Sequence, residues 1–224
     1  MRVLIAATLG FALVTGAASA APWSDPNGRL VFDAPAGWTT SVEQSGEYTY
    51  VVTGTANNEC HIISRPSPRT ATVSAAAVRV AGANDAQFND AFWQTLANGF
   101  GRIFPANSAQ VQSHSQDSSQ FWPIQRAVIQ SPQRSDLTAP IQAGFEMRPG
   151  FELMTLCMTY GGPDATQTYD AVMRSVGHPN DATFQADAER LGAQNAAANA
   201  AADAQNAQTQ EEIDREARRR RVQH

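Results

Sequence analysis

Lysine is absent from this sequence, and arginine supplies all 16 fixed positive charges against 21 acidic residues, for a formal net charge of −5. Binding to nucleic acid needs a basic surface that neutralises phosphates. Acidic residues outnumber arginines both in residues 21–180 and in residues 181–224. The charge balance therefore argues against nucleic acid as a partner.

Linear catalytic motifs are also absent. The chain has no G-x-S-x-G serine turn and no glycine pattern of the phosphate- or dinucleotide-binding type. Glu146 and Glu152 flank a Pro149-Gly150 turn. Acids near a hairpin tip usually face water, whereas a general acid needs a site that raises its pKa. We therefore expect no catalytic residue and no cofactor; an enzyme with an active site dispersed along the chain is the alternative.

Long hydrophobic runs are missing except at the start of the chain. Arg2 precedes an apolar run that extends to Val14, and Ala18-Ser19-Ala20 matches the small-residue site that signal peptidase reads. The run is shorter than the roughly 20 residues of a membrane-spanning helix, and no cysteine near the cleavage site offers a lipid anchor. We expect a cleavable signal peptide over residues 1–20 and a periplasmic or secreted mature chain without a transmembrane segment. An uncleaved membrane anchor is the alternative.

Cysteine is scarce, with Cys60 and Cys157 as the only two in the chain. Two cysteines in an exported protein usually pair. Both lie in segments whose patterns are typical of strands, so we expect a disulfide that joins two strands far apart in the sequence. Two buried, reduced thiols are the alternative. The absence of a C-x-x-C motif argues against a redox role.

Metal-binding side chains are few and scattered. His61, His114 and His178 share no recognisable ligand spacing. Methionine sulfur suits Cu(I), but methionines on apolar faces normally fill gaps in the core. Three of the candidates fall on a predicted hairpin face and the fourth on a predicted helix stripe: Met147, Met154, Met158 and Met173. No metal site is therefore expected.

Alternating apolar residues predict antiparallel strands in the first third of the mature chain. These strands cover residues 29–34, 38–42 and 48–52 and the segment around Cys60, with a hairpin turn at residues 45–47. The prolines of residues 65–68 end the last of these strands, because proline cannot donate to a strand ladder.

Two helices are predicted by apolar stripes. The first is capped by Asn84 or Asp85, carries large apolar side chains at every fourth position over residues 88–96, and ends at Gly99. The second begins around Pro163 and stops at Gly177. Residues 71–83 fit either a helix or a strand.

Strands return in the second half, over residues 110–115, 123–130 and 141–160. The last range is a hairpin with a type II turn at Pro149-Gly150, in which Phe145 opposes Met154. One face of this hairpin is apolar, and its second strand is mostly apolar on the other face as well. That strand is therefore predicted to lie centrally in a sheet with helices on at least one face.

The composition changes after Asn180 to alanine, glutamine, asparagine and aspartate. Alanine favours a helix, but this segment has no apolar face to bury. We therefore expect a single α+β domain over residues 21–180, followed over residues 181–224 by a low-complexity polar tail that is a frayed helix or disordered.

Four consecutive arginines stand near the end of the tail: Arg218, Arg219, Arg220 and Arg221. They are the predicted contact for an acidic partner or for weak peripheral binding to an anionic lipid surface. A solvated charged end that aids solubility is the alternative.

A short motif marks the end of the first predicted strand, where Phe32-Asp33-Ala34 leads into the turn Pro35-Ala36-Gly37-Trp38. Antiparallel strands, a helix, more strands and a closing helix follow. Over roughly residues 27–178 this order resembles the Mog1/PsbP-like superfamily. The resemblance implies an antiparallel sheet flanked by helices, as in an α/β/α sandwich, and a binding or accessory role. It implies no catalytic residue, because such folds host unrelated functions.

Taken together, these features predict an exported, non-catalytic binding or accessory protein of the cell envelope. Its partner is expected to be an envelope or secreted protein, or a small ligand, held on a sheet surface or groove of the α+β domain. Trp23, Trp38 and Trp122 are candidate aromatic anchors, with core packing as the alternative interpretation. A further hypothesis makes the tail a tether to the envelope surface.

Overall fold

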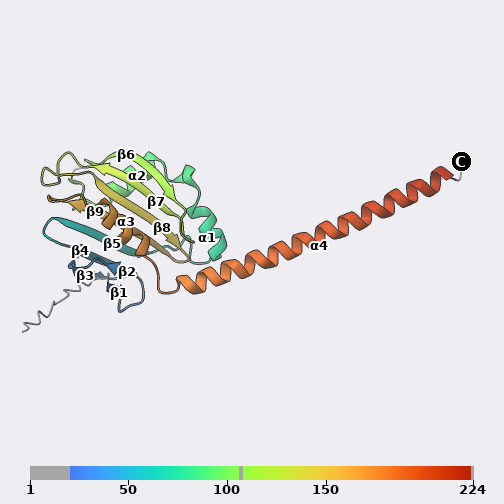
Figure 1. Cartoon of the computed structure of the whole chain (residues 1–224), viewed down its shortest axis with the longest axis horizontal. Helices are drawn as coiled ribbons and strands as arrows, with labels where there is room; N and C mark the ends of the chain where they lie inside the picture. Colours follow the sequence, from blue (N-terminus) through green and yellow to red (C-terminus); the bar gives the residue numbers. More distant parts are fainter. Residues whose placement is uncertain (1–20, 106–107, 223–224) are drawn as a thin grey trace, which may run out of the picture.

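The computed structural model describes residues 21–105 and 108–222 (Figure 1). The predicted signal peptide, residues 1–20, lies outside the described residues. In the part of the chain that is described, no helix is both long and apolar enough to cross a membrane.

Two antiparallel sheets form the body of the molecule. The small one pairs β1 (Ala21–Ser24) with β2 (Val31–Ala34). The large one has the strand order β3-β4-β5-β9-β8-β7-β6. Its strands are β3 (Thr39–Ser45), β4 (Tyr48–Gly54), β5 (Asn58–Pro66), β6 (Gln110–Asp117), β7 (Ile124–Gln130), β8 (Ile141–Arg148) and β9 (Phe151–Thr159).

The helices are α1 (Ala75–Gly82), the 3-10 turn η1 (Asp85–Gln87), α2 (Asp90–Asn98), α3 (Thr166–Ser175) and α4 (Asp181–Val222). Antiparallel strands with helices outside them make an α+β fold, which confirms the predicted fold class. The central position predicted for the second hairpin strand is also confirmed, because β9 is the fourth of the seven strands. Phe145 opposes Met154 across the β8–β9 hairpin as predicted, and Gly150 has the positive φ of 80° that a type II turn requires.

The large sheet has a separate apolar cluster on each face, because successive strand residues point to opposite sides. On one face, Ile63 and Phe145 pack with Trp93 of α2. On the other face, Ile62 packs with residues of α3, including Tyr169, and with the small sheet. We call these the α2 face and the α3 face.

A disulfide joins the central strand β9 to its neighbour β5. Cys60 of β5 and Cys157 of β9 are direct partners in the ladder, and their sulfurs are bonded. Both side chains are fully buried on the α3 face. The structure thus contains the expected disulfide between two strands, with the cysteines 97 residues apart in the sequence.

Two helix starts refine the sequence prediction. Residues 71–83, which fitted either a helix or a strand, contain α1, and its N-cap Ser74 accepts a hydrogen bond from the backbone of Ala77.

The predicted cap of α2 at Asn84 or Asp85 is wrong. The cap is Asn89, whose side chain accepts from the backbone N–H of Phe92 at 3.1 Å. Phe88 follows η1 and packs on the same core as Trp93 of α2. The apolar pattern in the sequence therefore begins before the helix itself.

The chain ends in one long helix that projects away from the body (Figure 1). The 42 residues of α4 correspond to about 63 Å at 1.5 Å per residue. The sequence indicated a frayed helix or a disordered tail, and the structure has a continuous helix, as its alanine content favours.

The first turns of α4 pack against the body of the molecule. The Asp181 carboxylate accepts from Arg148 Nε at 2.8 Å. Phe184 and Ala188 pack against α1 and Trp122. In the sequence, Phe184 is the one large apolar residue of these turns.

Candidate functional site

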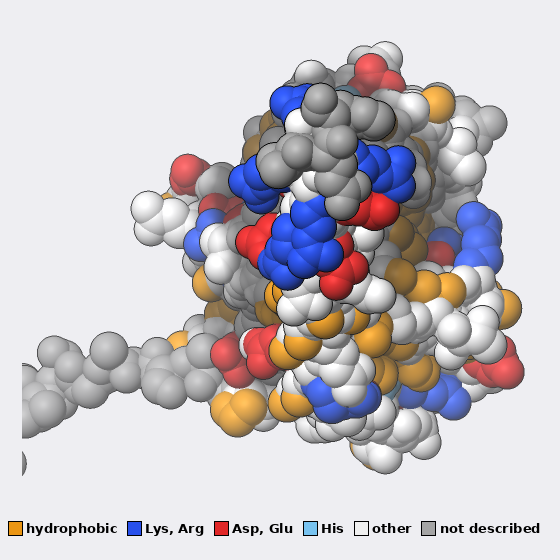
Figure 2. All heavy atoms as spheres, turned by 90° about the vertical axis from the view of Figure 1, so that its right-hand side faces the viewer, with side chains coloured by type: hydrophobic (Ala, Val, Ile, Leu, Met, Phe, Trp, Pro, Cys, Tyr) orange, Lys and Arg blue, Asp and Glu red, His pale blue; other side chains and the backbone are white. Residues whose placement is uncertain are grey.

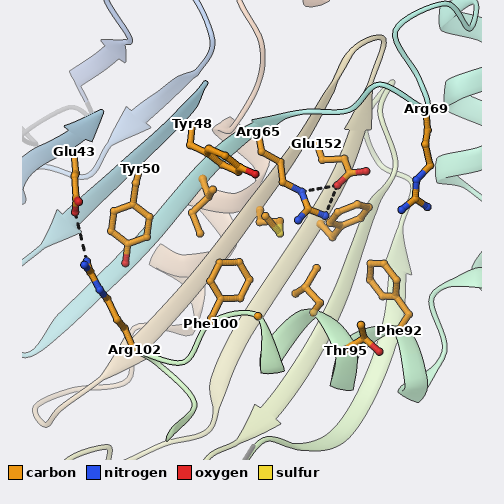
Figure 3. Close-up of a pocket in the computed structure, with 15 residues that line it drawn as sticks. Glu43, Tyr48, Tyr50, Arg65, Arg69, Phe92, Thr95, Phe100, Arg102 and Glu152 are labelled. Carbon is orange, nitrogen blue, oxygen red and sulfur yellow. Dashed lines mark hydrogen bonds and ion pairs between the residues drawn. The ribbon is translucent and has the colours of Figure 1, made fainter. Parts of the chain in front are cut away.

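A cleft with a volume of about 670 Å³ opens on the α2 face of the sheet, a size typical of small-molecule sites. It lies between α2 on one side and β3, β4 and β5 on the other (Figure 3). We call it the α2 cleft and define it by Tyr50, Ile63, Arg69, Phe92, Leu96 and Met154.

The size of α2 explains why the cleft is open. A helix is about 10 Å wide, whereas seven strands spaced about 4.8 Å apart make a sheet nearly 30 Å across. Trp93 and Ala97 form the buried side of α2. Phe92 and Leu96 lie on the flank of α2 that faces β3–β5. Because α1 contacts this face only around Met147, α2 leaves the part of the sheet face over β3–β5 uncovered.

The inner surface of the cleft is apolar. Ile63, Phe145 and Met154 are buried at its base. Phe92 is only partly buried in its wall, and Tyr48 at the outer edge is 51% exposed. A ligand with an apolar body would therefore remove hydrocarbon and aromatic surface from water, which is favourable by about 25 cal/mol per Å².

Two ion pairs stand at the rim. Arg65 Nη2 is 2.5 Å from Glu152 Oε2, and Glu152 also accepts from the Ser67 hydroxyl at 3.1 Å. Arg102 and Glu43 are 3.5 Å apart, with side chains 83% and 60% exposed. The first pair is tightly held, whereas the second is open to solvent and contributes little.

Arg69 is the third cation of the rim. No described residue makes an ion pair or hydrogen bond with its guanidinium. Figure 3 shows its side chain extending from the loop after β5 toward the opening of the cleft, across from α2. The cleft rim thus has three arginines and two glutamates, and Arg69 is the cation in excess.

The loop that carries Arg69 is fixed on both sides of this residue. The backbone N–H of Ser67 donates to Gly150 O at 2.7 Å. The Thr70 hydroxyl donates to Arg148 O at 2.9 Å and accepts from Gly150 N–H at 3.1 Å. Both Ser67 and Thr70 are buried. The β8–β9 turn therefore holds the Arg69 backbone in place while its side chain stays in solvent.

A chain of polar side chains runs behind one wall of the cleft. The Tyr50 hydroxyl hydrogen-bonds to His61 Nδ1, and His61 Nε2 lies 2.8 Å from Glu59 Oε1. The Tyr160 hydroxyl donates to the same Glu59 oxygen and is itself within 3.4 Å of Arg134 Nη2. Of these residues, Tyr50 lines the cleft.

The protonation states of this chain follow from its contacts. The hydrogen bond with His61 lowers the pKa of Glu59. Burial raises the pKa of Tyr50, and it raises that of Tyr160 to about 12. At neutral pH the carboxylate is therefore charged and both phenols are protonated. Both ring nitrogens of His61 are engaged, so the network presents a neutral phenol to the cleft and fixes its orientation.

The side chains considered as metal ligands in the sequence, for which no metal site was expected, lie apart from one another. His61 belongs to the network just described, His114 lies 3.6 Å from Asp90, and His178 stacks on Phe151. Among residues 21–105 and 108–222, no three His, Cys, Asp or Glu side chains are grouped as metal ligands. Met173 is on the α3 face, whereas Met154 and Met158 are in the core of the α2 face.

The expectation that Glu146 and Glu152 face water is wrong. Glu146 is buried and hydrogen-bonds with Arg148 at 2.9 Å. Glu152 forms the rim pair with Arg65. The turn does not expose them, because the loop after β5 packs on it from one side and α4 from the other.

The candidate aromatic anchors all pack against the core, and Trp23 and Trp38 are only partly buried. Trp23 contacts Phe32, and Trp38 packs edge-on against Tyr169. Trp122 is buried beside the start of α4. The arginines at positions 218–221 are exposed near the far end of α4, remote from the cleft (Figure 1).

Sequence reasoning missed the cleft, since its residues come from β3, β4, β5, α2, β8 and β9. One local signal was present. Arg65 and Arg69 bracket the Pro66-Ser67-Pro68 segment, so one cation stands just before the end of a strand and one just after it.

No protein-family model matches the chain, and no curated protein matches its sequence. Solved structures do resemble it. Cyanobacterial PsbP from Synechocystis sp. PCC 6803 has a TM-score of 0.47 and 16% identity, over 76% of this chain and 98% of that one. A protein from Bacteroides thetaiotaomicron has a TM-score of 0.39 and 9% identity, over 71% of this chain and 48% of that one. The PsbP likeness agrees with the resemblance predicted from the order of elements, and at these values it carries no argument about function.

Proposed function

We propose that this chain is an exported accessory protein that binds a small ligand in the α2 cleft. The observation that carries the proposal is a cleft of about 670 Å³ whose base is apolar and whose rim is charged. Sites for small molecules combine an apolar surface with a few polar groups that fix orientation. The signal-like N-terminus and the disulfide are consistent with export to a periplasmic or extracellular location.

An enzyme with a dispersed active site is the alternative, and its nearest candidate is the Tyr50–His61–Glu59 network. A general base has to reach the substrate in its unprotonated form. Glu59 is occupied by His61 and Tyr160, and burial raises the pKa of the Tyr50 phenol. These contacts favour a positioning role for the network and a binding role for the cleft.

The test uses the neutral fluorescent probe 1-anilinonaphthalene and the chain from residue 21 onward. Thr95 is exposed on α2 and lines the cleft, so Thr95→Trp places an indole in the opening without removing a buried contact. We expect a saturable fluorescence increase with the wild-type protein and at least tenfold weaker binding with this variant.

The matched control is Val80→Trp, which adds the same side chain at a position that is 70% exposed on α1 and does not line the cleft. It should leave the affinity for the probe unchanged. Equal affinity in the wild type and Thr95→Trp would place probe binding elsewhere and overturn the proposal.

A second candidate function is a tether to an anionic surface, and it is supported by the direction of α4. The helix projects from the body (Figure 1). Viewed from the side of its free end, the front of the molecule has basic and acidic side chains mixed together (Figure 2). Arg218–Arg221 are exposed, and Arg220 pairs with Glu216. A helix with no apolar face does not insert into a bilayer, so this contact would be electrostatic.

A further inference from the structure

We infer that the ligand of the α2 cleft is a small amphiphile with one anionic headgroup, whose apolar part lies over Phe145 and Met154 and whose headgroup contacts Arg69. This inference rests on the proposed function and specifies its ligand class. It follows from the distribution of charge around the rim, from the fixed loop below Arg69 and from the apolar base.

The rim charges favour an anion over a cation or a neutral molecule. Both rim carboxylates already have an arginine partner, since Glu152 bonds with Arg65 and Ser67 and Glu43 lies 3.5 Å from Arg102. Arg69 has no acidic partner among the described residues. A carboxylate or phosphate on a ligand would supply that partner, and arginine binds both groups through two parallel hydrogen bonds.

The fixed loop below Arg69 reduces the conformational entropy that is lost when a ligand contacts this arginine. Ser67 and Thr70 fix the loop to the β8–β9 turn through buried hydrogen bonds, so binding has to order only the Arg69 side chain. A cation carried by a fixed backbone beside an apolar base is partly preorganised for an amphiphile that has its charge at one end.

The experiment compares two probes with the same aromatic body. 8-Anilinonaphthalene-1-sulfonate differs from 1-anilinonaphthalene by one sulfonate. We expect the sulfonate to bind the wild-type protein about two- to five-fold more tightly, the range expected for a partly solvated ion pair. This preference should fall as the NaCl concentration rises.

Arg69→Gln should abolish the preference and leave the affinity for the neutral probe unchanged. The control is Arg190→Gln, which removes the same charge from an exposed position on α4 and should leave both affinities unchanged. Equal binding of the two probes by the wild type would overturn the inference, as would a preference that survives in Arg69→Gln.

Competition then identifies the headgroup. Dodecanoate and dodecyl phosphate should displace the sulfonate probe at lower concentrations than 1-dodecanol, and the better of the two acids distinguishes a carboxylate from a phosphate ligand. Displacement by 1-dodecanol at the same concentration as both acids would overturn the inference. Failure of the proposed function is recognised separately, because Thr95→Trp would then leave the binding of both probes unchanged.

Discussion

Arg148 and Glu146 form an ion pair inside the protein, with side chains 2% and 4% exposed. The Arg148 guanidinium also lies over the Trp122 ring and bonds with Asp181 of α4. Removing one member of a buried pair leaves the other charge uncompensated, which typically costs about 3–5 kcal/mol. The contacts of Arg148 therefore join the sheet to the start of α4.

Glu146 should make the stability of the fold depend on pH. Burial raises its pKa from an ordinary value of 4.5 to about 7, against the opposing effect of Arg148. Between these two values the unfolded chain releases a proton that the folded chain retains, so this residue lowers the stability of the wild type as pH rises through the window. The stability of Glu146→Gln relative to wild type should therefore increase from pH 4 to pH 8, by up to about 3 kcal/mol.

Urea unfolding of both proteins at pH 4, 6 and 8 measures this difference. Glu211→Gln, a change at an exposed position on α4, serves as the control and should differ from wild type by a constant amount. A constant difference for Glu146→Gln would show that the carboxyl group titrates normally in the folded protein.

At the scale of elements, the first turns of α4 should act as part of the domain. A chain of residues 21–180 loses Phe184, Ala188 and the Asp181–Arg148 contact. We predict that its free energy of unfolding is lower than that of the full mature chain by at least about 2 kcal/mol. A chain of residues 21–192 keeps these contacts and should match the full mature chain in urea unfolding. Equal stability of the two truncated chains would contradict this role of α4.

The elements that sequence predicts well are those defined by neighbouring residues. The β8–β9 hairpin follows from Pro149-Gly150 and from alternation on either side, so its register was predictable. The cap of α2 was misplaced because Asn84 and Asn89 are equally suitable residues, and tertiary packing of Phe88 decides between them. The α2 cleft was not predictable, because it depends on how much of this sheet face the packed helices leave uncovered.

At the scale of the whole molecule, the tether hypothesis predicts binding to vesicles of phosphatidylglycerol at low salt. Changing Arg218–Arg221 to glutamine should weaken co-sedimentation at least tenfold, since each arginine near an anionic surface contributes about 1 kcal/mol. Raising NaCl to about 0.5 M should have the same effect by screening.

The control variant changes the charge in the opposite direction. Glu211 and Glu212 precede the arginines on α4 and offset their charge, so replacing both with glutamine should strengthen co-sedimentation. Unchanged binding after loss of the four arginines would show that the end of α4 does not tether the protein.

The position of the disulfide also has a consequence for how the chain folds as it is made. A chain made from its N-terminus produces β3, β4 and β5 before the other strands of the large sheet, and the inner edge of β5 must wait for β9, whose cysteine lies 97 residues later. Long-range pairing of this kind is slow, and an unpaired edge invites contact with other chains. With only two cysteines in the sequence, Cys60 has no wrong intramolecular partner. A free Cys60 thiol therefore indicates a molecule in which β9 has not yet paired with β5. Formation of the Cys60–Cys157 disulfide indicates that these two strands have paired.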